Sequence, residues 1–273
     1  MKYYPLPDGS QLPALGLGTW RMGGGTVPDT SQDSRVLHAL RYALEIGYRH
    51  IDTAEMYAAG HTEELVGRAL RESGVPRAEV FLTSKVWHTH LRYQEVVRAC
   101  EDSLRRLQTD YLDLYLIHWP SSDVPLEETF RALNDLVRQA KIRFVGVSNF
   151  DVPLLQKAVS LCETPLLTNQ VPYSLHNRTY QRNGVLSFCR ENGLLLTAYT
   201  PLEKGHLAQD DVLETIAARR GVKPAQVALA WLLNQPGVVT IPKTLSPVHL
   251  EENLAAAEMQ LSEEEMRLLN ALE

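Results

Sequence analysis

Two kinds of apolar pattern alternate along this chain. Short runs that are apolar almost throughout, such as residues 112–117, are typical of strands in a parallel sheet covered on both faces. Between them lie longer segments in which apolar residues return every three or four positions, which indicates amphipathic helices. We therefore expect eight strands, each followed by a helix. The predicted strands are residues 15–19, 48–52, 80–85, 111–118, 144–148, 166–170, 194–199 and 238–241.

A β-hairpin is predicted ahead of these units, at residues 1–15, because Asp8-Gly9 forms a tight-turn signal between two short apolar runs. The last two predicted helices each begin at a serine, Ser246 or Ser262, with a glutamate nearby, as helix N-termini prefer. The segments with helical periodicity are residues 31–46, 62–71, 93–107, 126–139, 152–161, 183–191, 211–220, 223–234, 246–256 and 262–272.

Eight strand–helix units within one chain of 273 residues predict a (β/α)8 TIM barrel. No break in composition, linker or low-complexity segment divides the sequence, so residues 1–273 are expected to form a single domain. An open, doubly wound sheet is the alternative, and the count of eight units favours the barrel. The hairpin and the extra helices near the C-terminus are additions to the basic barrel.

Composition narrows the classes of function. The chain is 44% apolar and 22% charged with a formal net charge of −6, which argues against a nucleic-acid partner. Its three cysteines are far apart, so buried thiols in a reducing compartment are expected rather than disulfides. No apolar stretch follows a basic N-terminal region, and no apolar run reaches about eighteen residues. We expect a soluble cytoplasmic protein without a membrane partner.

Polar residues stand at the C-terminal ends of several predicted strands, where the active sites of such barrels lie. Each has a structural explanation of its own: a carboxylate can cap a turn, and a lysine or histidine can lie at the rim in solvent. Their shared position favours chemistry instead. The residues are Asp52, Lys85, His118, Asn149, Gln170 and Tyr199.

Tyr57 follows the strand that ends at Asp52, and together with Lys85 it indicates proton donation. A phenol with a pKa of about 10 is a poor donor at neutral pH, and a neighbouring cation lowers that pKa. Asp52 would hold the lysine charged, and a neutral His118 would orient a carbonyl oxygen. This set suits the protonation of an oxygen on which negative charge develops.

Six motifs in order and spacing make the chain resemble the aldo-keto reductase family over essentially its whole length. They are Gly16-Leu17-Gly18-Thr19-Trp20, Asp52-Thr53-Ala54-Glu55-Met56-Tyr57, Ser84-Lys85-Val86-Trp87, Leu116-Ile117-His118-Trp119-Pro120, Gly146-Val147-Ser148-Asn149-Phe150 and Ile241-Pro242-Lys243-Thr244.

The resemblance implies NADPH-dependent reduction of aldehydes and some ketones, with Asp52, Tyr57, Lys85 and His118 as a catalytic tetrad and Tyr57 as proton donor. It further implies that a nicotinamide dinucleotide is held by Gly18, Thr19, Ser148, Asn149, Gln170, Tyr199, Thr200, Pro201, Leu202, Gly205, Lys243, Thr244, Ser246, His249, Glu252 and Asn253. The Rossmann fingerprint is absent, because Arg21 stands where a third glycine would be required after Gly16 and Gly18.

The chain departs from the family pattern at His249, where many members place an arginine that grips the 2′-phosphate of NADPH. A neutral histidine is a weaker phosphate ligand. NADPH remains the expected cofactor, with Lys243 and Thr244 retained, and use of NADH is the alternative.

Short loops after the strands predict an open, permissive pocket lined by Trp20, Trp87 and Trp119, each of which could instead be plain packing. This shortness resembles bacterial members that reduce small aldehydes and 2-oxoaldehydes such as methylglyoxal. A monomer is expected.

Three other functions stay open at this point. Lys85 could be the nucleophile of a Schiff-base aldolase. The fold also serves as a nicotinamide-binding regulatory subunit of channels. A metal-dependent hydrolase using His61 and His118 is less favoured, because no strand carries a His-x-His pair, and we expect no metal.

Overall fold

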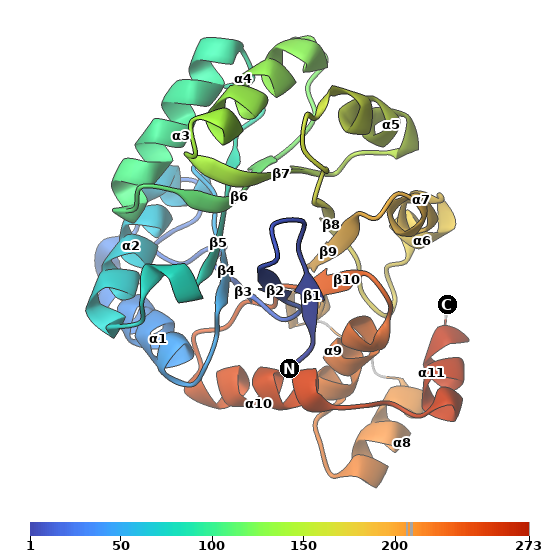
Figure 1. Ribbon diagram of the computed structural model, residues 1–273. Helices are drawn as coiled ribbons and strands as arrows, with labels where there is room; N and C mark the ends of the chain where they lie inside the picture. Colours follow the sequence, from blue (N-terminus) through green and yellow to red (C-terminus); the bar gives the residue numbers. More distant parts are fainter. Residues whose placement is uncertain (206, 208–209, 273) are drawn as a thin grey trace.

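Eight parallel strands form a ring in the computed structural model, which describes residues 1–205, 207 and 210–272 (Figure 1). Neighbours in the ring are also neighbours in the chain, so every connection is a strand–helix–strand unit. The strands are β3 (Leu17–Gly18), β4 (His50–Asp52), β5 (Phe81–Val86), β6 (Leu112–Ile117), β7 (Ile142–Ser148), β8 (Thr168–Pro172), β9 (Leu195–Tyr199) and β10 (Val238–Thr240).

The ring is closed by backbone hydrogen bonds between its last strand and the segment that enters its first. The Gly16 N–H donates to the Thr240 carbonyl at 2.8 Å, and the Thr240 N–H donates to the Ala14 carbonyl at 2.8 Å. Closure removes the free sheet edges of an open sheet. The predicted (β/α)8 barrel is thereby confirmed, and the open doubly wound alternative is wrong.

Helices surround the ring on its outer side (Figure 1). Three of them, α6, α8 and α11, are additions to the one-helix-per-strand pattern, and α8 and α11 pack against each other beside the barrel. The helices are α1 (Asp33–Glu45), α2 (His61–Ser73), α3 (Tyr93–Leu107), α4 (Leu126–Arg138), α5 (Val152–Leu161), α6 (Thr179–Arg182), α7 (Val185–Glu191), α8 (Asp211–Arg220), α9 (Pro224–Asn234), α10 (Pro247–Glu258) and α11 (Glu263–Asn270), with single 3-10 turns η1 (Thr30–Gln32), η2 (Tyr57–Gly60), η3 (Arg77–Glu79) and η4 (Glu203–Gly205).

The N-terminal hairpin closes the N-terminal end of the barrel. Strands β1 (Tyr3–Pro5) and β2 (Gln11–Pro13) pair antiparallel, and in Figure 1 they lie across the ring of strands. Leu6 and Leu12 of the hairpin pack with apolar side chains inside the barrel, among them Phe81 and Phe144. Since this end is covered, the opposite end, where the strands finish, is the one left for a ligand.

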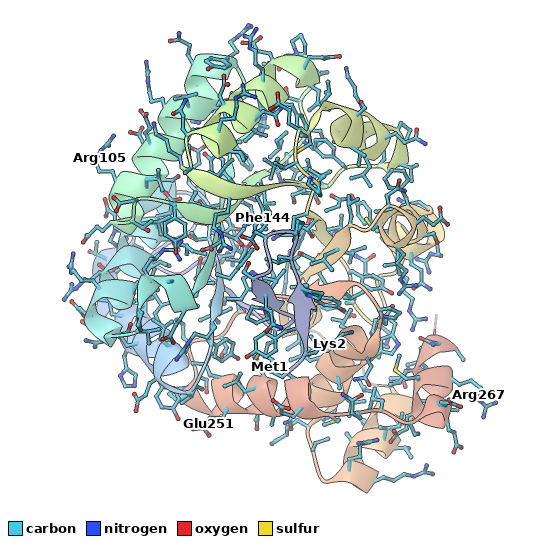
Figure 2. All side chains as sticks on the ribbon, viewed as in Figure 1. Met1, Lys2, Arg105, Phe144, Glu251 and Arg267 are labelled. Atoms are coloured by element: carbon cyan, nitrogen blue, oxygen red, sulfur yellow. The ribbon has the colours of Figure 1, made fainter. Side chains whose placement is uncertain are left out.

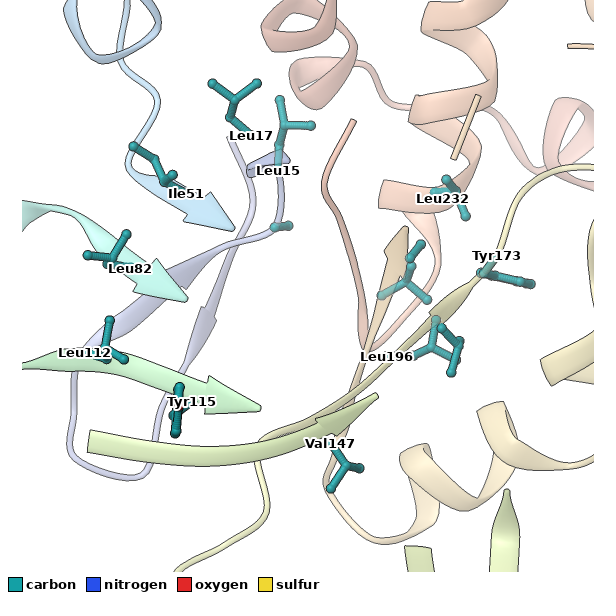
Figure 3. Packing of buried hydrophobic residues seen from close by; sticks show 14 of the residues in the cluster. Leu15, Leu17, Ile51, Leu82, Leu112, Tyr115, Val147, Tyr173, Leu196 and Leu232 are labelled. Carbon is teal, nitrogen blue, oxygen red and sulfur yellow. The ribbon is translucent and has the colours of Figure 1, made fainter. Parts of the chain in front are cut away.

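A second apolar layer lies between the strands and the helices, and it supplies most of the core. Figure 3 shows side chains of this layer, Leu82, Tyr115, Val147 and Leu196 among them, projecting from successive strands. Burying one such side chain stabilises the fold by about 1.5–3 kcal/mol. This layer fixes the strands and so fixes the positions of the residues at their ends.

Charged side chains cover the outside of the helices. Figure 2 shows Arg105 and Arg267 reaching away from the helices that carry them, whereas Phe144 lies within the ring. Among the residues described, no helix has the length and apolar character needed to cross a membrane.

The observed elements differ most from the predicted ones in two places. The helix predicted at 183–191 is α7 and begins only at Val185, because Gly184 adopts a left-handed φ of 87° before it, and the short helix α6 that precedes this glycine was not predicted. The strand predicted at 166–170 is β8, shifted to residues 168–172, because pairing with β9 continues through Pro172 opposite Tyr199.

Candidate active site

Lys85 and Asp52 form a buried ion pair at the C-terminal ends of β4 and β5. The parallel register places Asp52 beside Thr83, so Lys85 lies two residues further toward the barrel mouth. Its Nζ donates to Asp52 Oδ1 at 2.5 Å, to the Thr53 carbonyl at 2.8 Å and to the Tyr57 hydroxyl at 3.2 Å. All three N–H groups of the ammonium therefore have acceptors.

The electrostatics of the pair keep the lysine charged. Burial alone lowers the pKa of Lys85, but the Asp52 carboxylate and Tyr57 outweigh it and raise that pKa above its usual value. The second carboxylate oxygen of Asp52 accepts from Gln170 Nε2 at 2.8 Å. Both oxygens are thus engaged, which fixes the orientation of the carboxylate. The resemblance gave Gln170 a carboxamide contact; here its amide nitrogen faces Asp52.

Tyr57 lies on a strained turn. The next two residues, Ala58 and Ala59, have φ values of 50° and 52°, in the left-handed region that alanine rarely adopts. The Ala58 N–H donates to the Gly25 carbonyl at 2.8 Å, which ties the turn to the loop after β3. The turn folds the phenol back over the strand ends.

The net pKa shift of Tyr57 corrects one expectation. The Lys85 cation does lower the pKa of the phenol, but burial raises it by more, so the pKa of Tyr57 is raised above 10.0. Sequence patterns show which charges can meet, whereas desolvation depends on the packed structure. The hydroxyl is therefore protonated at neutral pH, beside a fixed cation.

His118 completes the cluster as a neutral ring. Burial, followed by the nearby Lys85 charge, lowers the pKa of His118 to about 2. Its ring stands edge-on to Tyr57 at 5.7 Å and to Trp87 at 5.1 Å between centroids. Its Nδ1 is buried without a hydrogen-bond partner among the described residues.

A cluster of hydrogen-bonded amide and hydroxyl side chains lies beside the tetrad, at the ends of β7, β8 and β9. Asn149, left-handed at φ 63°, donates from its amide to Ser148 Oγ at 2.9 Å and accepts from the Tyr199 hydroxyl at 2.9 Å. Ser148 Oγ in turn donates to the Gln170 carbonyl at 2.8 Å. The arrangement presents oriented amide and hydroxyl groups near His118.

The loop after β9 carries further left-handed residues, Thr200, Glu203 and Lys204, with φ values of 50°, 52° and 59°. The Glu203 carboxylate accepts from Ser174 Oγ at 2.8 Å and lies 3.0 Å from His176 Nδ1, which fastens the loop to the one after β8. Of the residues predicted here, Thr200, Pro201, Leu202 and Gly205 are thereby placed on a fixed turn, in which the Gly205 N–H donates to the Leu202 carbonyl at 2.8 Å.

Cations and a helix N-terminus gather where the adenosine end of a dinucleotide was predicted. Ser246 caps α10, its Oγ accepting from the His249 N–H, and Thr244 Oγ1 accepts from the Ser246 N–H at 3.1 Å. Burial and the charges of Arg35 and Arg21 lower the pKa of Lys243. Lys243, whose charge Arg35 and Arg21 disfavour, and the capped N-terminus of α10 fit an anionic ligand. Sequence reasoning missed Arg21 and Arg35 as members of this group.

The remaining predicted residues of this segment differ in exposure. His249 is exposed on the first turn of α10, whereas Asn253 is buried at 5% exposure. The backbone carbonyl of Glu252 accepts from Gln226 Nε2 at 3.0 Å, which joins α10 to α9.

Gly18 and Thr19 lie at the start of the site. A Cβ on Gly18 would come within 2.6 Å of the Ile241 carbonyl oxygen, so only glycine fits between β3 and the segment after β10. Thr19 Oγ1 donates to the Asp52 carbonyl at 2.9 Å, which engages its hydroxyl within the barrel.

The three predicted pocket tryptophans differ in packing and exposure. Trp20 packs against Tyr57 with 4.9 Å between ring centroids, and Trp87 packs against His118. Trp119 is 43% exposed. This exposure agrees with an open pocket.

Glu55 lies inside the motif that joins Asp52 to Tyr57, and no role was predicted for it from the sequence. Its carboxylate accepts from the Trp87 N–H at 2.5 Å, and its own N–H donates to the Lys85 carbonyl at 3.3 Å. Glu55 therefore hydrogen-bonds the backbone at the end of β5 through two residues, Lys85 and Trp87. The signal in the sequence was an acidic residue that stands between two residues of the site, Asp52 and Tyr57.

Two cavities lie away from this cluster. One of about 310 Å³ is at the N-terminal end, beside Asp113 and Arg143, and one of about 480 Å³ lies between α1, α2 and α3. Asp113 and Arg143 form an ion pair with each other. Within the described part of the chain, no three His, Cys, Asp or Glu side chains gather as metal ligands would, and His61 pairs with Asp33 and Glu64 instead.

Comparison with known proteins places this geometry in context. The profile of the Aldo/keto reductase family matches residues 14–273. The methylglyoxal reductase YeaE of Escherichia coli (strain K12) is 42% identical over 265 residues, which are 95% of this chain and 90% of that protein.

Solved structures agree over the whole length. The crystal structure of a thermostable aldo-keto reductase, Tm1743, in complex with the inhibitor epalrestat superposes with a TM-score of 0.97 at 49% identity, covering 100% of both chains. An aldo-keto reductase from Klebsiella pneumoniae in complex with NADPH gives a TM-score of 0.89 at 41% identity, covering 98% of this chain and 94% of that one.

Proposed function

The chain belongs to the aldo/keto reductase family, and we propose that it reduces small aldehydes, 2-oxoaldehydes such as methylglyoxal and some ketones to alcohols with NADPH. The observation that carries this proposal is the single ammonium of Lys85, which joins Asp52 Oδ1 to the Tyr57 hydroxyl. The similarity to a methylglyoxal reductase and to a reductase with bound NADPH supports the choice of substrate and cofactor.

Bound NADPH would supply a hydride to the carbonyl carbon. The chain supplies the proton: the Tyr57 hydroxyl donates it to the carbonyl oxygen as negative charge develops there. The protonated Lys85, 3.2 Å from that hydroxyl, stabilises the phenolate that remains. Asp52 holds the lysine in place, and the neutral His118 ring orients the carbonyl oxygen. Trp20, Trp87 and Trp119 would line the substrate pocket.

The groups proposed to hold the cofactor fit its two ends. Ser148, Asn149, Gln170 and Tyr199 offer amide and hydroxyl groups suited to a carboxamide and an aromatic ring. Lys243 and the N-terminus of α10 suit a phosphate. NADPH is proposed over NADH for this reason, with Gly18, Thr19, Thr200, Pro201, Leu202, Gly205, Thr244, Ser246, His249, Glu252 and Asn253 completing the set.

The geometry disfavours a Schiff-base aldolase. A nucleophilic lysine must be neutral with a free lone pair. Lys85 instead has a raised pKa and donates all three of its N–H groups. Borohydride in the presence of an aldehyde should therefore trap no adduct on Lys85. A purely regulatory nicotinamide-binding role is disfavoured because Asp52, Tyr57, Lys85 and His118 all meet.

Tyr57→Phe tests the proposal. Loss of the proton donor should lower kcat for methylglyoxal by about 100-fold or more, while NADPH still binds. NADPH oxidation and cofactor fluorescence titration measure the two effects. Tyr115→Phe is the matched control, since its hydroxyl is fully buried on β6 without a partner among the described residues; it should turn over normally. Equal activity in Tyr57→Phe and wild type would refute the assigned proton donor.

We also propose that residues 1–273 act as one domain, as a monomer and in the cytoplasm. Free thiols support a reducing compartment, since Cys100, Cys162 and Cys189 are unpaired. Light scattering on the purified protein tests the monomer, and a mass of twice 30.7 kDa would contradict it.

A further inference from the structure

The turn that carries Tyr57 stores strain next to the proton donor. Ala58 and Ala59 are both left-handed, and Gly60 follows at φ 93°. Two consecutive alanines hold this conformation only where surrounding contacts impose it. A contact that imposes it would control the position of the Tyr57 hydroxyl relative to Lys85.

Arg106 of α3 lies directly on this turn. A Cβ on Gly60 would come within 2.7 Å of Cδ and Nε of Arg106, so the arginine side chain covers the backbone of Gly60. The guanidinium is fixed in turn, because its Nε donates to Glu63 Oε2 at 2.7 Å and its Nη2 donates to Ser103 Oγ at 3.3 Å.

Glu63 joins this arginine to the strand that carries Lys85. The residue is fully buried on the first turn of α2. Its Oε1 accepts from Ser84 Oγ at 2.5 Å, and Ser84 immediately precedes Lys85 on β5. One buried carboxylate thus contacts both the support of the Tyr57 turn and the strand beneath the ammonium.

We propose that Glu63 is a positioning residue, whose carboxylate, through Arg106 and Ser84, holds the strained turn against β5 and keeps the Tyr57 hydroxyl within reach of Lys85. It does not touch the reacting atoms. The inference rests on the proposed reductase function, because the Tyr57–Lys85 distance matters only where Tyr57 transfers a proton.

Glu63→Gln removes the charge that fixes Arg106 while keeping the size of the side chain. A small displacement of a donor is costly to a chemical step, so kcat for aldehyde reduction should fall about 10- to 100-fold. The KM for the aldehyde and the Kd for NADPH should stay within about twofold, because neither binding surface changes. Should this variant fold poorly, Ser84→Ala removes only the hydrogen bond from Ser84 Oγ to Glu63. It should lower kcat by less than Glu63→Gln does and leave the KM and the Kd unchanged.

Asp113→Asn is the matched control. Asp113, like Glu63, is a buried carboxylate that pairs with arginine, here Arg77 and Arg143, but it lies at the N-terminal end of the barrel. The substitution should lower the melting temperature and leave kcat unchanged. A loss of kcat in Glu63→Gln no larger than that in Asp113→Asn would overturn the positioning role.

Relief of strain separates positioning from a general structural role. Ala59 is exposed, and glycine adopts its left-handed φ without strain. Adding Ala59→Gly to Glu63→Gln should therefore raise kcat at least about threefold above that of Glu63→Gln alone, because the turn then needs less support. No recovery would count against the proposal.

Hydrogen exchange gives a readout independent of turnover. The Ala58 N–H, bonded to the Gly25 carbonyl, should exchange faster in Glu63→Gln and not in Asp113→Asn. If the wild-type protein reduced no carbonyl with NADPH, the proposed function would fail while exchange at Ala58 still decided whether Glu63 holds the turn. Unchanged exchange in Glu63→Gln would reject the inference.

Discussion

The Lys85 ammonium has no contact with solvent, and its charge is balanced by the carboxylate of Asp52 alone among its three acceptors. Bringing two charges into the interior costs free energy that their attraction and hydrogen bonds must offset. Removing one partner leaves the other charge buried and uncompensated, which costs more than the pair contributes.

A double-mutant cycle tests this coupling. Asp52→Asn and Lys85→Met should each lower the free energy of unfolding by about 3–5 kcal/mol. The double variant should be more stable than the sum of the two losses predicts, because neither charge remains. Urea unfolding measures all four proteins. Simple additivity would show that the two side chains do not interact in the folded state, contrary to their 2.5 Å contact.

The single side chain at 249 should set the preference between cofactors. His249→Arg places a permanently charged, bidentate donor on the first turn of α10, next to Lys243. We expect kcat/KM for NADPH to rise about tenfold, or about 1.4 kcal/mol, and that for NADH to stay constant. The exposed His38→Arg on α1 adds the same charge elsewhere and should change neither value. An equal rise with both cofactors would mean that position 249 does not contact the 2′-phosphate.

At the scale of elements, two serine-capped helices should behave differently. Ser246 caps α10 at the proposed phosphate site, whereas Ser262 caps α11, with Glu265 completing a capping box far from it. Each serine→alanine change should cost about 1 kcal/mol of stability. Only Ser246→Ala should also raise the Kd for NADPH, which fluorescence titration measures. A matching rise in Ser262→Ala would point to a general loss of stability.

Local patterns predict most of these elements but not the contacts between distant ones. Apolar runs ending in a polar residue marked Asp52, Lys85 and His118, because strand ends in a barrel converge on one face. Glu63 and Arg106 lie forty-three residues apart, and only packing of α2 on α3 brings them together. The same holds for Arg21 and Arg35, whose charges reach Lys243 from the loop after β3 and from α1. The raised pKa of Tyr57 likewise follows from burial, which no spacing records.

Across the whole molecule, the two ends of the barrel have different tasks. The N-terminal end is closed by the hairpin and by paired charges around Asp113, and these contacts stabilise the fold. The C-terminal end contains strained turns, at Ala58 and Ala59 and in the loop after β9, which cost stability. Each end contains a buried neutral histidine, His50 or His118, and these two rings couple the stability of the fold to pH.

His50 and His118 should make the protein lose stability in mild acid. Burial lowers the pKa of His50 to about 4 and that of His118 to about 2, from 6.5 for each when unfolded. The unfolded chain therefore binds more protons below pH 6.5, so stability is full above that pH and falls as pH drops toward the folded values. Each histidine should contribute a loss of about 1.4 kcal/mol per pH unit.

The window between about pH 6.5 and 4.5 separates this effect from the carboxyl groups of Asp8 and Glu265, whose protonation changes stability only between their unfolded pKa values of 3.8 and 4.5 and their folded values of about 2. Glu63, whose pKa is raised by burial, acts in the opposite sense within the window. His50→Gln should reduce the slope of unfolding free energy against pH by about 1.4 kcal/mol per unit, measured by urea unfolding across the window. An unchanged slope would mean that His50 takes up its proton within the folded barrel. The start of β4 would then tolerate a positive charge two residues before Asp52.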